Sequence, residues 1–295
     1  MEDLIVAFLR SGTPLVYVAL AGVIAQRAGI WHLGLEGMMI TGACATIVGI
    51  VLAQSVVVGL VAGALFCCLL AVLFWFVVEV LKANQIIAGL GLTGLGLGGT
   101  ALALTAIFGS EAAVSAPFGL PRIGPAFGAF GGLSVLVAAM PFVILACWLL
   151  LCRTRFGLRL AACGEHPFAA RATGVNPAKM RLVALLLGGP LCALGGAELA
   201  AGSLQIFSVN MTAGRGFMSF AAVIFGAGHP VGATLAAFFF ALVGALGIRA
   251  QLAYGDRIPS SLLLALPYVA TVIGLWISAR IRGGNAVSSR ELGQQ

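Results

Sequence analysis

The sequence predicts an all-α, polytopic membrane protein, a bundle of about eight to ten transmembrane helices in a single domain over residues 1–295. Two features of composition support this fold class. Hydrophobic residues make up 61% of the chain and charged residues only 8%, whereas a soluble domain carries roughly 25% charged residues. The apolar runs are also long and do not alternate with polar residues, so they fit helices rather than the strands of a barrel.

Candidate spans follow from the roughly 20 apolar residues that a helix needs to cross the hydrocarbon of a bilayer. The chain contains such runs at 13–31, 34–54, 56–78, 84–108, 132–152, 182–202, 229–248 and 259–279. A shorter run at 216–228 is interrupted by Gly226, Gly228 and the following Pro230. Interruptions of this kind are typical of the broken helices that form transport sites. The same pattern fits equally well a tight outer loop whose carbonyls are bound by Arg215.

The distribution of basic residues predicts the orientation. The segment 153–181 carries six Lys and Arg residues, and the tail 280–295 carries three more. Because excess Lys and Arg marks the cytoplasmic side of a membrane protein, we expect both regions to be cytoplasmic. The segment 109–131, whose only charges are Glu111 and Arg122, is then outside. The net charge of +7 thus reflects topology and predicts no nucleic-acid partner.

Motifs of other function classes are incomplete. Residues 89–94 read GLGLTG, but this glycine pattern lies inside an apolar run and does not predict a dinucleotide site. We expect the glycines of this run to let another helix approach closely, namely Gly91, Gly94, Gly96, Gly98 and Gly99. Neither lysine is followed by Ser or Thr, as a phosphate loop requires, and the three histidines are far apart. The sequence therefore predicts no catalytic site, no cofactor and no metal site, with any ATP and Mg²⁺ bound by another subunit.

The segment between the fifth and sixth predicted spans contains a candidate docking helix. Glu165 and Pro167 are typical of a helix start, and Gly174 of a helix end. Ala169 and Ala170 give this helix a small-residue face that suits docking into the groove of another protein. The charge pattern alone fits equally well a solvated basic loop that only sets topology.

The same segment resembles the coupling loop of bacterial ABC importer permeases, which has the pattern E-A-A, three residues, Gly. Its G-E-x-P opening is similar to that of permeases for branched-chain amino acids, ribose and nucleosides. The matching residues are Gly164, Glu165, Pro167, Ala169, Ala170 and Gly174. Phe168 replaces the acid of E-A-A, which leaves Glu165 as the nearest acidic residue.

Three further segments resemble the nucleoside-type permeases of this group. They are GIWHLGLEGMMITGA at 29–43, ANQIIAGLGLTGLGLGGT at 83–100 and NMTAGRGFMSFAAVIFG at 210–226. In the first segment His32 stands where Asn is usual. The matches together extend from residue 12 to residue 279.

The resemblance implies a transport subunit, not an enzyme, in the bacterial inner (plasma) membrane. Its implied partners are ABC ATPase subunits at the coupling loop, a second permease (a related paralogue or another copy of this chain), an extracytoplasmic substrate-binding protein and membrane lipid. The implied cargo is a small neutral solute. A nucleoside is the cargo that the resemblance favours, because the segments quoted above are most similar to those of the nucleoside-type permeases. A sugar or other small solute, an ion-coupled secondary transporter and a membrane enzyme are the alternatives.

Charged and polar residues at membrane depth are the candidates for the translocation path, because a charge there costs roughly 2.5–3.5 kcal/mol. Glu36 either faces the path or is a helix-start acid stabilised by its helix dipole. Glu198 either has a role or reaches water at the outer end of its span. The few fixed charges favour an uncharged solute. The candidate path residues are Glu36, Asn84, Gln85, Asn210, Thr212, Arg215 and Phe217.

Overall fold

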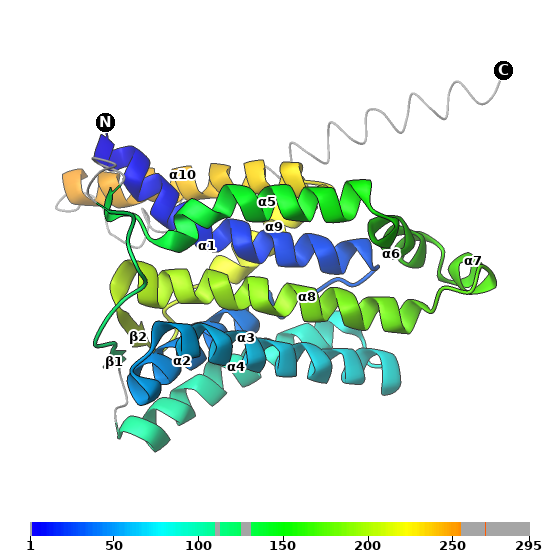
Figure 1. The fold of residues 1–295 in the computed structure, drawn as a ribbon, viewed down its shortest axis with the longest axis horizontal. Coiled ribbons are helices and arrows are strands. Elements are labelled where there is room, and N and C mark those ends of the chain that lie inside the picture. The colour runs from blue at the N-terminus through cyan, green and yellow to red at the C-terminus, as the bar shows by residue number, and fades with distance from the viewer. Residues whose placement is uncertain (1, 110–112, 125–130, 255–268, 270–295) are drawn as a thin grey trace.

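The computed structural model describes residues 2–109, 113–124, 131–254 and 269, and its long helices run side by side along one axis (Figure 1). In the described part of the chain, seven helices are long and apolar enough to cross a membrane. This confirms the prediction of an all-α membrane bundle. The span expected at 259–279 lies outside the described residues.

The long helices are joined by short connections, and two of them end in a π-helical turn. They are α1 (Glu2–Arg27), α2 (Leu35–Ala53), α3 (Val56–Trp75) with η1 (Phe76–Val80), α4 (Gln85–Phe108), α5 (Val135–Arg153), α8 (Pro177–Ala197) with η3 (Glu198–Leu204) and α10 (Pro230–Tyr254). Helix α1 begins eleven residues before the expected start at residue 13. The expectation used hydropathy alone, and the polar residues before Pro14 do not prevent a helix.

Shorter elements mark the two ends of the bundle. At one end, α6 (Arg155–Glu165) and α7 (Pro167–Ala172) connect α5 to α8 (Figure 1). At the other end, β1 (Ala113–Ser115) and β2 (Ile206–Ser208) form a two-stranded antiparallel sheet that was not predicted. We refer to these as the α6–α7 end, which is the predicted cytoplasmic end, and the β1–β2 end.

The chain between α8 and α10 runs the length of the bundle as a broken element. It starts in β2, passes through a turn and continues as the short helix α9 (Arg215–Phe225). In α9, the Ser219 hydroxyl donates to the carbonyl of Leu15, which lies about 18 Å along α1 from Arg27. After α9, the carbonyl of Gly228 accepts a hydrogen bond from Arg27 at the α6–α7 end. The interrupted span predicted at 216–228 is therefore a half-length helix that begins inside the bundle.

Small residues allow the central helices to pack closely, as is common in membranes. A Cβ on Gly37 of α2 would lie within 3 Å of the backbone of α4, and a Cβ on Gly96 of α4 would meet Gly37 in turn. The neighbouring glycines on α4 differ from the expectation, because nothing among the described residues lies within 4 Å of their Cβ positions. These are Gly91, Gly94, Gly98 and Gly99.

Candidate translocation site and coupling segment

Glu36 lies at the start of α2 with only 2% of its surface exposed, and its carboxylate is bound by the turn before α9. Oε1 accepts hydrogen bonds from the hydroxyl of Thr212 at 2.5 Å and from the backbone N–H of Gly214 at 2.9 Å. Oε2 accepts from the N–H of Gly216 at 2.5 Å. A carboxylate at a helix N-terminus is stabilised by the free N–H groups and the helix dipole. Glu36 is thus paired with the helix dipole of α9, not only with that of its own helix.

The turn before α9 has unusual backbone geometry. Asn210 and Ala213 have positive φ angles of 60° and 45°, and Gly214 has a φ of 81°. For residues other than glycine such angles cost free energy and persist only where the surrounding structure imposes them. The hydrogen bonds to Glu36 supply this constraint, so the carboxylate and the strained turn form one unit.

Gly216 is required by the close approach of α9 to α2. A Cβ at this position would lie against the Cα and N of Glu36. Because the obstacle is backbone, it cannot move aside as a flexible side chain would. Gly214 and Gly216 therefore belong to the candidate site through their N–H groups, although neither is among the path residues predicted from the sequence.

The structure brings together part of the predicted path. Glu36 and Thr212 are in direct contact, and the guanidinium of Arg215 donates to the carbonyl of Met211 in the same turn at 3.1 Å. Asn210 and Phe217 lie on the same segment and are exposed. These residues surround the point where the broken element turns into helix α9.

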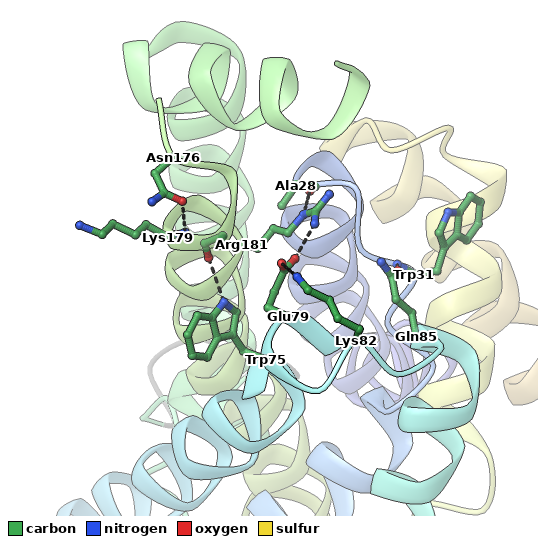
Figure 2. A network of polar contacts seen from close by, with 10 residues as sticks. Ala28, Trp31, Trp75, Glu79, Lys82, Gln85, Asn176, Lys179 and Arg181 are labelled. Carbon is green, nitrogen blue, oxygen red and sulfur yellow. Dashed lines mark hydrogen bonds and ion pairs between the residues drawn. The ribbon is translucent and has the colours of Figure 1, made fainter. Parts of the chain in front are cut away.

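Asn84 and Gln85 lie elsewhere, at the α6–α7 end. The Asn84 side chain caps α4 by accepting from the N–H groups of Ile86 and Ile87. The Gln85 side chain accepts from the backbone N–H of Trp31 at 2.9 Å, as Figure 2 shows. Both amides therefore stabilise the connections between spans.

The candidate coupling segment, which we define as α6, α7 and the residues up to Gly174, differs in detail from the predicted helix. Glu165 ends α6 instead of starting a helix, because α6 extends from its Thr154 cap, whose hydroxyl accepts from the N–H of Gly157. Pro167 starts α7, and Gly174 follows it with a φ of 83°. On α7 the side chain of Phe168 is 86% exposed, and Ala169 is also exposed.

Two predicted docking residues pack inside the chain. Ala170 is only 3% exposed, so its side chain is not available to a partner in this arrangement. Gly164 lies against the α1–α2 turn, where a Cβ would be 2.8 Å from the N of Gly29. Both positions shape the coupling segment and anchor it to the bundle.

A network of polar contacts holds the start of α8 at the same end (Figure 2). Arg181 forms an ion pair with Glu79 of η1, and its Nε donates to the carbonyl of Ala28 at 3.2 Å. The indole N–H of Trp75 donates to the carbonyl of Ala178 at 2.9 Å. The segment α6–α7 is therefore anchored on both sides, through Gly164 before α7 and through Arg181 after it.

Comparison with known proteins finds a family model and relatives that cover nearly the whole chain. The chain matches the family model described as branched-chain amino acid transport system / permease component over residues 4–274. It is 33% identical to the nucleoside ABC transporter permease protein NupC of Lactococcus lactis subsp. cremoris over 98% of both chains. It is 32% identical to the guanosine ABC transporter permease protein NupQ of Bacillus subtilis, over 93% of this chain and 91% of that one.

A relative with another cargo in its name is also similar. The chain is 30% identical to a glucose ABC transporter permease protein of Haloferax volcanii, over 86% of this chain and 71% of that one. These matches set aside the ion-coupled transporter and the membrane enzyme. The chain belongs to the branched-chain amino acid transport system / permease component family and is a multi-pass permease subunit of an ABC importer in the plasma membrane.

Proposed function

We propose that this permease carries an uncharged nucleoside, and the observation that carries the proposal is the carboxylate of Glu36 at the N-terminus of α9. In transporters with broken helices, the positive end of a half-helix points at anionic groups of the substrate. Here the described residues place the chain's own carboxylate at that position.

The occupied helix end disfavours an anionic cargo. A phosphate approaching α9 meets a buried carboxylate whose negative charge is not screened by water, and like charges repel strongly in such a medium. A neutral solute avoids both this repulsion and the cost of desolvating an ion. The site therefore suits a nucleoside better than a nucleotide.

Relatives and aromatic surface favour a nucleoside over a sugar. The two relatives that match more than nine tenths of the chain carry guanosine and nucleoside in their names, while a putative glucose permease and a glucose permease are 33% and 30% identical over 83% and 86% of the chain. Phe217, on the first turn of α9, is 37% exposed. Aromatic side chains of this kind stack on flat bases.

The proposal is tested by ATP-dependent uptake into proteoliposomes that hold the complete complex. Labelled inosine, glucose, ribose and inosine monophosphate are compared at equal concentration, with and without ATP. We expect ATP-dependent uptake of inosine and none of its monophosphate. Uptake of glucose or ribose without uptake of inosine would show that the cargo is a sugar, and uptake of the monophosphate would contradict the role given to Glu36.

We further propose that α7 docks in a groove of the ATPase through Phe168, with Ala169 and Glu165 beside it. A large apolar side chain on an exposed short helix is the type of anchor that dominates helix-in-groove binding. Phe168→Ala should uncouple ATP hydrolysis from uptake while the permease still inserts. The matched control is Phe142→Ala, because Phe142 is 74% exposed on α5. Equal uptake by both variants would end this assignment.

The remaining partners follow from the family and are expected on both sides of the membrane. ATPase subunits are expected at the α6–α7 end, and a substrate-binding protein at the β1–β2 end. A second permease, either a paralogue or another copy of this chain, is expected to complete the pore within the lipid bilayer. Purification of the tagged permease from cells that express the neighbouring genes, followed by subunit stoichiometry, distinguishes a homodimer from a heterodimer.

A further inference from the structure

A polar cavity of about 480 Å³ opens at the α6–α7 end, and Glu36 is not among its lining residues. Its walls come from three junctions: the end of α1 with the α1–α2 turn, the end of α6, and the α9–α10 turn. These junctions already contact one another, because Gly164 of α6 packs on Gly29 and Arg27 donates to the carbonyl of Gly228. A molecule in the cavity therefore contacts all three at once.

A residue in the cavity wall carries an acceptor that lacks a donor. Gln26 lies in its wall, and the Oε1 atom of Gln26 is buried without a hydrogen-bond partner among the described residues. Buried polar atoms in native proteins are normally paired, so an unpaired one needs an explanation. A ligand that carries an N–H or O–H group supplies the missing donor once the Gln26 amide turns toward the cavity.

The other lining groups indicate the chemistry of that ligand. The indole of Trp31 is 48% exposed, with its ring centroid 6.3 Å from that of Phe220, and offers a flat apolar surface. Arg27 and Glu165 also line the cavity and carry opposite charges. An uncharged, flat heteroaromatic molecule with hydroxyl groups fits this combination, since it stacks on an indole and both donates and accepts hydrogen bonds.

We propose that this cavity is a second solute-binding site, which takes up the transported nucleoside from the predicted cytoplasmic side. The inference rests on the proposed function for the identity of the ligand, but not for the location of the site. A ligand that needs all three junctions together stabilises the arrangement in which they meet. We expect these three junctions to separate during the transport cycle, so that occupancy slows turnover and accumulated solute restrains its own import.

The direct test measures how much inosine binds to the complex when no substrate-binding protein is present to deliver it. The purified permease–ATPase complex, lacking the substrate-binding protein, is dialysed against labelled inosine. We expect saturable binding that is weakened roughly tenfold by Trp31→Ala, since the stacking of a base on an aromatic ring contributes about 1–3 kcal/mol. Gln26→Leu should also weaken it. The control is Trp148→Ala, which removes an indole that packs against Arg153 on α5, outside the cavity.

The second test measures the consequence in proteoliposomes of the complete complex preloaded with inosine. Initial ATP hydrolysis and uptake are expressed relative to the same variant without internal inosine. Internal inosine should slow the wild type and Trp148→Ala, but slow Trp31→Ala only at roughly tenfold higher concentration. Normal inosine uptake with no binding in dialysis and no internal inhibition would overturn the cavity proposal alone. Absence of inosine uptake, with binding that still depends on Trp31, would overturn the cargo assignment alone.

Discussion

The two glutamates that are buried in the described part of the chain differ in what surrounds them. Glu36 accepts three hydrogen bonds, two of them from backbone N–H groups of the α9 N-terminus. Glu198, which is fully buried, accepts one from the Ser134 hydroxyl at 2.5 Å, and its Oε1 has no hydrogen-bond partner among the described residues. The alternative that Glu198 reaches water is therefore wrong.

The difference shows that burial alone does not identify a functional carboxylate. Glu36 organises a segment that is 176 or more residues away in sequence, and that segment adopts strained angles which need such support. Glu198 accepts a hydrogen bond from a single side chain, that of Ser134, which caps the N-terminus of α5. We therefore expect changes at the Glu36 site to affect transport strongly and changes at the Glu198 site to have small effects.

The largest effect is expected from Glu36→Ala, which leaves the donors of the α9 turn without an acceptor. Each buried unsatisfied donor costs about 1–3 kcal/mol, so uptake should fall at least about tenfold. Initial uptake rate per inserted complex is the measurement. Glu36→Gln, which keeps the shape and one acceptor oxygen, should lose less activity. Wild-type uptake by Glu36→Ala would contradict the expectation that the Glu36 site matters more for transport than the Glu198 site.

A steric change at the same contact is expected to have the next largest effect. Gly216→Ala places a Cβ against the backbone of Glu36, and overpacking of this kind costs about 1–3 kcal/mol. Thermal unfolding of the purified protein should show a lower Tm and uptake should decrease. Gly91→Ala on α4 is the matched control, because its Cβ meets nothing within 4 Å and alanine favours a helix. Equal Tm changes in the two variants would contradict the close approach.

The Glu198 site should tolerate an isosteric change. In Glu198→Gln the amide oxygen still accepts from Ser134, so we expect uptake within about twofold of wild type and a stability change under about 1 kcal/mol. Ser134→Ala should have a larger effect on stability, because the Ser134 hydroxyl also accepts from the N–H of Val137 at the start of α5. If Glu198→Gln lowered uptake as much as Glu36→Ala is expected to do, the number of hydrogen-bond donors around each carboxylate would not decide which glutamate matters for transport.

The smallest effect concerns His32, a buried ionisable group in the turn just before Glu36. Burial lowers the pKa of His32 to about 4, from an ordinary value of 6.5, so the folded protein holds it neutral at pH 7. Between pH 6.5 and 4 the unfolded chain binds a proton that the folded state resists, and stability therefore falls as the pH decreases through this range. His32→Asn should reduce the loss of Tm between pH 7 and pH 5. An unchanged pH dependence would show that His32 is not the group responsible.

Much of the fold was predictable from composition and local sequence. Long apolar runs located the spans, and the Gly and Pro residues after 216 located the broken element, because spanning length and backbone breaks are local properties. The motif at 164–174 and the segments at 29–43 and 210–226 were enough to indicate the permease family. Helix ends were less predictable, as α1 and the start of α7 show, because polar residues near a span end are compatible with helix and turn alike.

Only the tertiary structure decided which of the candidate residues meet. Glu36 pairs with Thr212 and the α9 N–H groups, while Asn84 and Gln85 cap and connect other helices. Ala170 is buried although its motif suggests an exposed docking face. Residue type and spacing indicate how much free energy it costs to bury a polar or charged group in the membrane. The hydrogen-bond partner that offsets this free energy comes from a distant helix, so it depends on how the helices pack. The sequence by itself determined the membrane bundle and its family, and the packing of α9 against α2 determined the site.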